Sequence, residues 1–388
     1  METFDFDRII DRRNTGSLKW DRYHGRDILP LWVADMDFTA PPAVIDALRK
    51  RLDHGVFGYT VPPDGLAEQV CGRLKKKYAW TVPSEAIVWL PGVVSGLNLA
   101  CRSVGEAGDQ VATLTPVYPP FFTAPSYSDR RLLTVPLDQM EHGRIAGCQQ
   151  WGLDMDRFDG AVSEHTALFT LCNPHNPTGR VFSRRELTEM AAVCDRRDIV
   201  ICSDEIHCEL LLDRNKTHRP IASLAPDISR RTITLMAPSK TFNIPGLNCS
   251  FAVIENRDLR SRFKACMQGI LSGVNTCGYV AALAAFRGGG AWQTALIDYL
   301  IGNRDTVEKA ILAAEGLKVN HVEATYLAWI DARTLPVASP AAFFEAAGVG
   351  LSDGKDFGGE GFLRLNFGCP RSTLNEALTR MFHALEAL

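Results

Sequence analysis

The sequence lacks the features that mark several large classes of protein. No apolar run approaches the ~18 residues that a membrane-spanning helix needs, and the acidic N-terminus has no apolar stretch like that of a signal peptide. A net charge of -3 over 388 residues, without a long block of lysine and arginine, argues against a nucleic-acid partner. The 11 cysteines include no C-x-x-C pair, so we expect free thiols in a reducing compartment. These absences favour a cytoplasmic protein that binds neither membranes nor nucleic acids.

Several catalytic motifs are missing as well. The chain has no G-x-G-x-x-G dinucleotide fingerprint, no P-loop and no H-E-x-x-H zinc motif. The serine of 92–96 stands one place out of the G-x-S-x-G pattern of a nucleophile elbow. The acids and the histidine of 203–207 match no standard ligand spacing, so we expect no metal site there.

What the sequence does contain is an alternation of apolar, strand-like runs with helical segments. This alternation predicts an α/β fold in which a largely parallel sheet is covered by helices on both faces. The expected strands are 86–90, 111–115, 167–172, 199–202, 232–236 and 249–254. The expected helices are 43–52 and 66–78, which precede the first strand, and 93–101 and one that opens with a capping box at Ser183 and Glu186, which lie between strands.

A run of three glycines, 288–290, is the expected boundary between two domains. A small-residue helix precedes it, and a long helix followed by two more strands comes after it. We expect a three-layer large domain of residues 42–287 with a sheet of seven-stranded type. Residues 1–41 and 288–388 together would form a smaller α+β domain.

Lys240 is the residue around which the other motifs are arranged. It lies in the turn after the buried strand 232–236, between Ser239 and Thr241. Open α/β sheets place their chemistry at the carboxyl ends of their strands. A lysine that is desolvated there can lose its proton and form a Schiff base with a carbonyl group. Most loop lysines are simply solvated, so the other segments decide between these interpretations.

A second element is the start of the helix that follows strand 86–90. The chain turns at Gly92, and Val93 and Val94 open the helix. Free backbone N–H groups and the helix dipole make such a turn an anion-binding site. This signal is weak on its own, but it lies on the same expected edge of the sheet as Lys240.

Further polar and aromatic residues also stand just after predicted strands. These residues are Tyr118, Asn176, Asp204 and His207. Arg364 differs because it lies within an apolar strand, where an arginine needs a fixed anionic partner such as a carboxylate.

Together these pieces match what pyridoxal 5'-phosphate (PLP) requires of a protein. Its aldehyde would react with Lys240. Its phosphate would bind the N–H groups around Gly92, Val93 and Val94 and the hydroxyl of Ser239.

The remaining residues match the ring of PLP and the substrate. Asp204 would keep the ring nitrogen protonated, and Tyr118 would stack on the ring. Asn176 and His207 are available to donate to the phenolic oxygen. Arg364 would bind the α-carboxylate of an amino-acid substrate together with Tyr118. We therefore expect Tyr118 and Asp204 to act with the lysine in catalysis.

Several segments also resemble those of a known family. Residues 173–179, 203–207 and 238–243 resemble the signature segments of fold-type-I PLP enzymes, the aminotransferase class I/II group. More narrowly, residues 32–38, 204–207 and 364–371 resemble the MalY/PatB group of cystathionine β-lyases, which are carbon–sulfur lyases. The resemblance runs over nearly the whole chain and implies the PLP-dependent transferase fold.

The resemblance also implies a homodimer with active sites at the subunit interface. Tyr59 should then reach the PLP phosphate of the partner subunit. Two positions depart from the pattern: Ala237 stands where many relatives have serine, and Asn248 where many aminotransferases have arginine. The phosphate is therefore expected to rely more on Ser239, backbone N–H groups and Tyr59.

The activity implied by the resemblance is α,β-elimination of L-cystathionine or a related cysteine S-conjugate. The products would be a thiol, pyruvate and ammonia. The residues alone do not separate this reaction from that of an aminotransferase, because both need Lys240 as base and Asp204 beside the ring nitrogen. A regulatory or binding protein that contains PLP is a third alternative.

Overall fold

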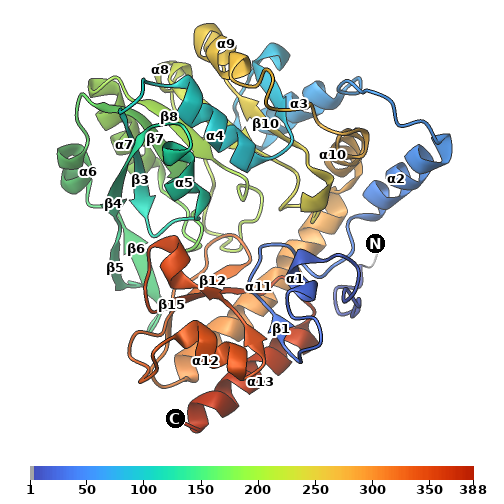
Figure 1. Ribbon diagram of the computed structural model, residues 1–388, viewed down its shortest axis with the longest axis vertical. Helices are drawn as coiled ribbons and strands as arrows, with labels where there is room; N and C mark the ends of the chain where they lie inside the picture. The colour runs from blue at the N-terminus through green and yellow to red at the C-terminus, as the bar shows by residue number, and fades with distance from the viewer. Residues whose placement is uncertain (1–3) are drawn as a thin grey trace.

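The computed structural model describes residues 4–388, and a seven-stranded sheet organises its larger part (Figure 1). Neighbouring strands pair in parallel except at β10, which is antiparallel to both β2 and β9. The predicted α/β fold with a mostly parallel seven-stranded sheet is therefore confirmed. In sheet order the strands are β2 (Ile87–Leu90), β10 (Ser250–Val253), β9 (Thr232–Met236), β8 (Val200–Asp204), β7 (Thr166–Cys172), β3 (Gln110–Thr115) and β4 (Arg131–Pro136).

Helices cover both faces of this sheet, which makes the predicted three layers. The central strands are buried on both faces, and every residue of β9 is buried. One face packs against α4 (Val93–Ser103), α5 (Pro120–Ser126) and α9 (Arg257–Ala265). The other packs against α6 (Met155–Ala161), α7 (Arg184–Arg196) and α8 (Pro226–Arg230).

The sequence predicted the bounds of several helices to within a few residues. The helix predicted over 66–78 is α3 (Leu66–Tyr78), and the one predicted over 43–52 is α2 (Pro42–His54). The capping box of Ser183 and Glu186 is present at the start of α7, where each residue bonds the backbone of the other.

A second, antiparallel sheet lies towards the C-terminus. Its order is β11 (Lys318–Val319), β12 (Leu327–Asp331), β15 (Phe362–Asn366) and β14 (Ser352–Asp353). Around it lie α11 (Gly290–Ala313), α12 (Pro340–Ala346) and α13 (Arg371–Glu386), which share one apolar core with the sheet. Arg364 lies in β15, so this sheet carries one of the predicted site residues.

The N-terminal part of the chain packs against this C-terminal region. Near the N-terminus, α1 (Leu18–Asp21) precedes β1 (Leu29–Pro30), and β1 pairs in parallel with β13 (Val349–Gly350) (Figure 1). Further along, α10 (Thr276–Gly288) ends where the glycine run begins. The division into domains at 287/288 stays a prediction.

The structure also contains elements that the sequence patterns did not reveal. A hairpin joins β5 (Asp138–Glu141) to β6 (Gln149–Gly152). β4 is an edge strand whose residues are mostly exposed or half-buried, and it was not among the predicted strands. Within residues 4–388, no helix combines the length and hydropathy that crossing a membrane requires.

Candidate active site

A cavity of about 550 Å³ opens at the carboxyl edge of the seven-stranded sheet. Parallel strands place their carboxyl ends on one edge, so the loops that follow them converge there. Every predicted site residue except Tyr59 lines this cavity: Gly92, Val93, Val94, Tyr118, Asn176, Asp204, His207, Ser239, Lys240 and Arg364.

Lys240 projects its amine into the cavity from the turn after β9. Its Nζ donates a hydrogen bond to the carbonyl oxygen of Ala34 at 2.5 Å. Burial and, to a smaller extent, the positive charge of Arg364 lower the pKa of Lys240, the nearby carboxylates of Asp35 and Asp204 oppose this shift, and the net pKa is about 8. A larger share of this amine is therefore neutral and nucleophilic near pH 7 than in an ordinary lysine.

Asp204 is the last residue of β8 and is buried. Burial raises the pKa of its carboxyl. The N–H of Ile206, which donates to Oδ1 at 3.1 Å, and the charge of Lys240 oppose that rise, and the net pKa is about 7. A cationic ring nitrogen beside Asp204 would hold this group as a carboxylate. The environment thus suits the partner of a pyridinium.

Arg364 is a buried guanidinium that contacts only neutral acceptors. It donates to Oδ1 of Asn176 at 2.9 Å, to the carbonyl of Trp32 at 2.8 Å and to Oγ of Ser352 at 3.3 Å. Its Nε is buried without a partner, it lies 4.6 Å from the Phe357 ring centroid, and burial lowers its pKa to about 10. Residues 4–388 give it no acid partner, so it is available for the carboxylate of a bound molecule.

Asn176 and His207, the predicted donors to a cofactor ring, both line the cavity. The Oδ1 of Asn176 accepts from Arg364, which leaves its Nδ2 free to donate elsewhere. Burial lowers the pKa of His207 well below its ordinary value, and the charges of Lys240 and Arg364 act in the same direction, so the ring is neutral. The buried Nδ1 of His207 has no partner in the described chain.

Tyr118 lines the cavity beside Asn176. The backbone N–H of Tyr118 donates to the carbonyl of Asn176 at 3.1 Å, which joins the loops after β3 and β7. Burial raises the pKa of the phenol, so the hydroxyl stays neutral at physiological pH. The ring is placed as a wall of the cavity, in keeping with its predicted stacking role.

The start of α4 gives the cavity a place that suits an anion. No side chain caps this helix, so its first N–H groups are free, and a Cβ added at Gly92 would meet open space. Ser239 and Asn248 also line the cavity, and Asn248 has the left-handed conformation with φ 52°. These groups fit a phosphate through N–H and O–H donors, without an arginine.

Sequence reasoning missed several residues that shape the cavity. Ser250 lines it and donates to the carbonyl of Leu90 at 3.1 Å. The hydroxyl of Tyr326 donates to the carbonyl of Ala34 at 2.9 Å. Asn366 stands two residues after Arg364, so both side chains lie on the same face of β15. This spacing could have identified Asn366 as a neighbour of the site.

Tyr59 is fully exposed and does not line the cavity. It lies between α2 and α3 in a stretch where Val56, Phe57 and Val61 are exposed too. Its predicted contact with the phosphate of a partner subunit requires a second copy of the chain and stays a prediction.

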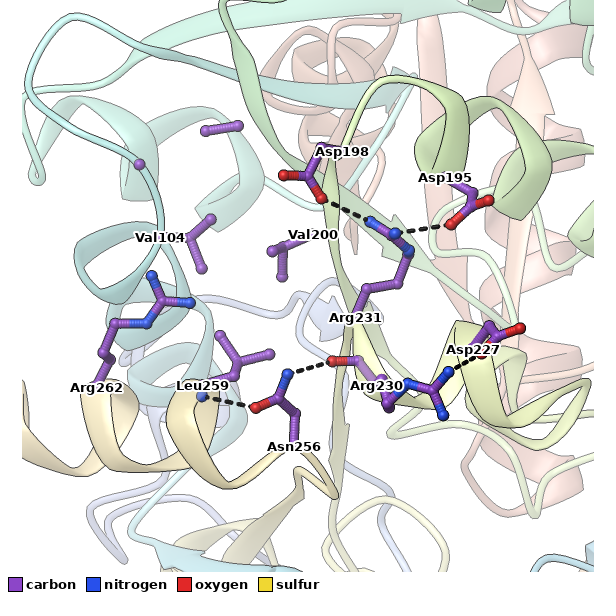
Figure 2. A pocket seen from close by; sticks show the side chains of 12 residues that line it. Val104, Asp195, Asp198, Val200, Asp227, Arg230, Arg231, Asn256, Leu259 and Arg262 are labelled. Atoms are coloured by element: carbon purple, nitrogen blue, oxygen red, sulfur yellow. Dashed lines mark hydrogen bonds and ion pairs between the residues drawn. The ribbon is translucent and has the colours of Figure 1, made fainter.

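A second cavity, of about 610 Å³, opens at the amino edge of the same sheet (Figure 2). Arg231 there pairs with Asp195 at 2.7 Å and with Asp198 at 3.3 Å, and Arg230 pairs with Asp227. None of the predicted site residues lines it.

Comparison with known proteins identifies the family. Residues 26–381 match the family described as "Aminotransferase class I and II". This chain belongs to the aminotransferase class I and II family. Among its relatives, Cystathionine beta-lyase PatB of Bacillus subtilis is 39% identical over 98% of this chain and 100% of its own length.

Solved structures agree with this family. The crystal structure of OvoB is 47% identical, with a TM-score of 0.95 over 99% of this chain and all of that one. Cystalysin from Treponema denticola, whose structure contains PLP, is 33% identical, with a TM-score of 0.93 over the full length of both chains. The predicted PLP-dependent transferase fold, the PLP cofactor and the membership of the MalY/PatB group are confirmed.

The cavity fits the family's cofactor on its own chemistry. A lysine of lowered pKa, a buried carboxyl, an uncapped helix start and unpartnered buried nitrogens of Arg364 and His207 lie within one space. Across residues 4–388, no group of three or more His, Cys, Asp or Glu side chains is arranged to hold a metal ion.

Proposed function

We propose that this chain is a PLP-dependent carbon–sulfur β-lyase that acts on L-cystathionine or a related cysteine S-conjugate. The main support for an amino-acid substrate is that one cavity contains both the amine of Lys240, with a pKa of about 8, and Arg364, which has no acid partner. The choice of a lyase over an aminotransferase is supported by the relative named cystathionine beta-lyase PatB.

In this proposal each side chain has a separate task. PLP, when bound, supplies the electron sink for the charge that develops at Cα of the substrate. Lys240 holds the cofactor and, once released, takes the Cα proton onto Nζ. Arg364 binds the α-carboxylate through its planar fork and so orients Cα for this transfer. Asp204, as a carboxylate, keeps the ring nitrogen protonated.

The net reaction consumes one water molecule. The bond between Cβ and sulfur breaks, and the sulfur leaves with the electron pair and is protonated to a thiol. Water then replaces the nitrogen at Cα, which leaves as ammonia, and the three-carbon fragment is pyruvate. No external oxidant or reductant is needed.

The test mixes PLP-loaded protein with L-cystathionine in the absence of any keto acid and follows pyruvate and free thiol. The expected result is pyruvate and thiol in equal amounts. Amino transfer that depends on an added keto acid, without pyruvate from cystathionine, would contradict the lyase and favour an aminotransferase. Bound PLP with neither activity on any cysteine conjugate would favour a regulatory or binding protein.

We also propose that the protein works as a cytoplasmic homodimer with shared active sites. The exposed side chains of Val56, Phe57, Tyr59 and Val61 support an interface in this region. All 11 cysteines are free, in keeping with a reducing compartment. A dimer in light scattering, and weaker PLP binding in Tyr59→Phe, are the expected results. A monomer with full activity would contradict the shared site.

A further inference from the structure

The backbone of residues 32–38, called here the 32–38 segment, supplies acceptors to both cations of the cavity. The carbonyl of Trp32 accepts from Arg364 at 2.8 Å, and that of Ala34 accepts from Lys240 at 2.5 Å. The segment contains no helix or strand, so its shape depends on hydrogen bonds from the rest of the chain.

Two of the side chains that hold this segment come from the C-terminal sheet region. Nδ2 of Asn366 donates to the carbonyls of Val33 at 2.6 Å and of Asp35 at 2.7 Å. The hydroxyl of Tyr326 donates to Ala34 at 2.9 Å, on the same carbonyl oxygen that accepts from the site lysine. The Ala34 carbonyl is therefore fixed by a donor that takes no part in the proposed proton transfer.

Another side chain that holds the segment, Asn243, comes from the turn of Lys240 itself. Its Oδ1 accepts from the N–H of Met36 at 2.9 Å, and its Nδ2 donates to the carbonyls of Met36 at 2.9 Å and Phe38 at 2.7 Å. Its backbone is left-handed, with φ 54°, a conformation that asparagine adopts more readily than most residues. Three hydrogen bonds thus tie the lysine turn to the segment that carries its acceptor.

We propose that Asn243 is a positioning residue for Lys240, because its hydrogen bonds to Met36 and Phe38 hold the segment whose Ala34 carbonyl accepts from the free lysine amine. A lysine side chain has four rotatable bonds, and holding it in one arrangement is costly without a fixed partner. With the acceptor fixed, the amine stays where it can meet PLP and, later, the Cα proton.

This role has a consequence for the protonation of the amine. A carbonyl acceptor favours the charged form of its donor. The charged groups that face the amine are Arg364, which lowers the pKa of Lys240, and Asp35 and Asp204, which raise it, and Asp35 belongs to the segment that Asn243 holds. When Asn243 loses its side chain, the Ala34 carbonyl is less well fixed and the pKa should fall further below about 8. Binding of the substrate carboxylate should change little, since Arg364 keeps Asn176 and Ser352.

The test compares wild type with Asn243→Gly, because glycine keeps the left-handed backbone and removes only the amide. The full-length chain is freed of PLP, and the rate of PLP recapture is followed by stopped-flow absorbance from about pH 6 to about pH 10, a range that spans the shifted amine. Only a neutral amine reacts, so the wild-type rate should rise with a midpoint near pH 8.

In Asn243→Gly we expect this midpoint to move down by about half a unit or more, and the plateau rate to fall about 10-fold. In turnover, kcat should fall by a similar factor while KM stays within about threefold of wild type. The matched control is Asn14→Gly, because Asn14 is exposed, shares the left-handed conformation with φ 59°, and lies outside the cavity. Its profile should match wild type.

A second variant, Asn243→Ser, keeps a short polar side chain that cannot bond both Met36 and Phe38, and it should move the midpoint in the same direction. If Asn243→Gly fails to fold, Asn243→Ser is the variant that decides. Profiles that superimpose on wild type in the folded variants would overturn the proposal. The inference rests on the proposed function only in that Lys240 binds PLP. Because recapture needs no substrate, failure of β-elimination and failure of this role are distinguishable.

Discussion

The two cavities at opposite edges of the seven-stranded sheet have similar volumes but opposite charge arrangements. At the amino edge, Arg230 and Arg231 are paired with aspartates near the surface (Figure 2). At the carboxyl edge, Lys240 and Arg364 lie in a buried space and contact backbone carbonyls, an amide and a hydroxyl. Ion pairs at the surface contribute little to stability, because water screens their charges. Buried charges that form no direct ion pair are costly, and that cost is typical of a site that binds a charged molecule.

The variant with the largest expected effect is Lys240→Ala. It removes both the group that holds the cofactor and the base, so kcat should fall at least ~1,000-fold. Steady-state turnover of a cysteine conjugate with saturating PLP is the measurement. Normal turnover in this variant would show that the carboxyl-edge cavity has been assigned wrongly.

Arg364→Lys should have the next largest effect. Lysine keeps the charge but loses the planar fork, so kcat/KM should fall about 100-fold, mainly through KM. The matched control is Arg231→Lys in the amino-edge cavity, which should leave kcat/KM within about twofold of wild type. Equal losses in both variants would remove the distinction between the cavities.

Replacing a buried lysine by methionine should change the free energy of unfolding in opposite directions, depending on whether the lysine has an acid partner. Lys19 is buried and pairs with Asp37 at 2.7 Å, so Lys19→Met should destabilise the PLP-free chain by about 2–4 kcal/mol at pH 7. Lys240→Met should instead stabilise it by about 1–3 kcal/mol, since it removes a buried charge that has no partner. Urea unfolding of both variants is the measurement, and destabilisation by Lys240→Met would contradict this account.

The stability changes in these two variants should also depend on pH, one at alkaline pH and the other at acidic pH. The folded pKa of Lys240 is about 8, below the ordinary 10.5, so the advantage of Lys240→Met is full below pH 8 and disappears as pH rises towards 10.5. Burial acts to raise the pKa of Asp37, but Lys19, Trp20 and Arg12 outweigh it, and the folded pKa is lowered. The stabilisation by this pair is therefore present above the ordinary pKa of about 3.9 and is lost as pH falls below it.

The smallest effect is expected at the exposed ion pair of the amino-edge cavity. Arg230→Ala should change the free energy of unfolding by about 0.5 kcal/mol or less and leave turnover unchanged, because its pairing with Asp227 is largely screened by water. Chemical unfolding and turnover of the same preparation test this together. A large loss of turnover would mean that the amino-edge cavity also takes part in function.

Much of the site could be predicted because its residues follow strands. A strand end is visible in sequence as an apolar run broken by proline, glycine or a polar residue, as before Lys240, Asn176 and Asp204. The geometry of parallel strands then brings these residues together without any further information.

The residues that hold the 32–38 segment could not be predicted in this way. Asn243, Tyr326 and Asn366 act on backbone carbonyls, and a carbonyl acceptor leaves no mark in the amino-acid sequence. The contacts also join positions more than 200 residues apart. The short strands β11, β13 and β14 were missed for a related reason, since two residues are too few to show a period.

The most direct test of the central claim is to locate the lysine that binds PLP. The PLP-loaded protein is treated with borohydride, which reduces the bond between the cofactor and its lysine to a stable form, and is then digested and analysed by mass spectrometry. The expected result is a single phosphopyridoxyl group on the peptide that contains Lys240. A group on any other lysine, with Lys240 unmodified, would contradict the assignment of the carboxyl-edge cavity as the active site.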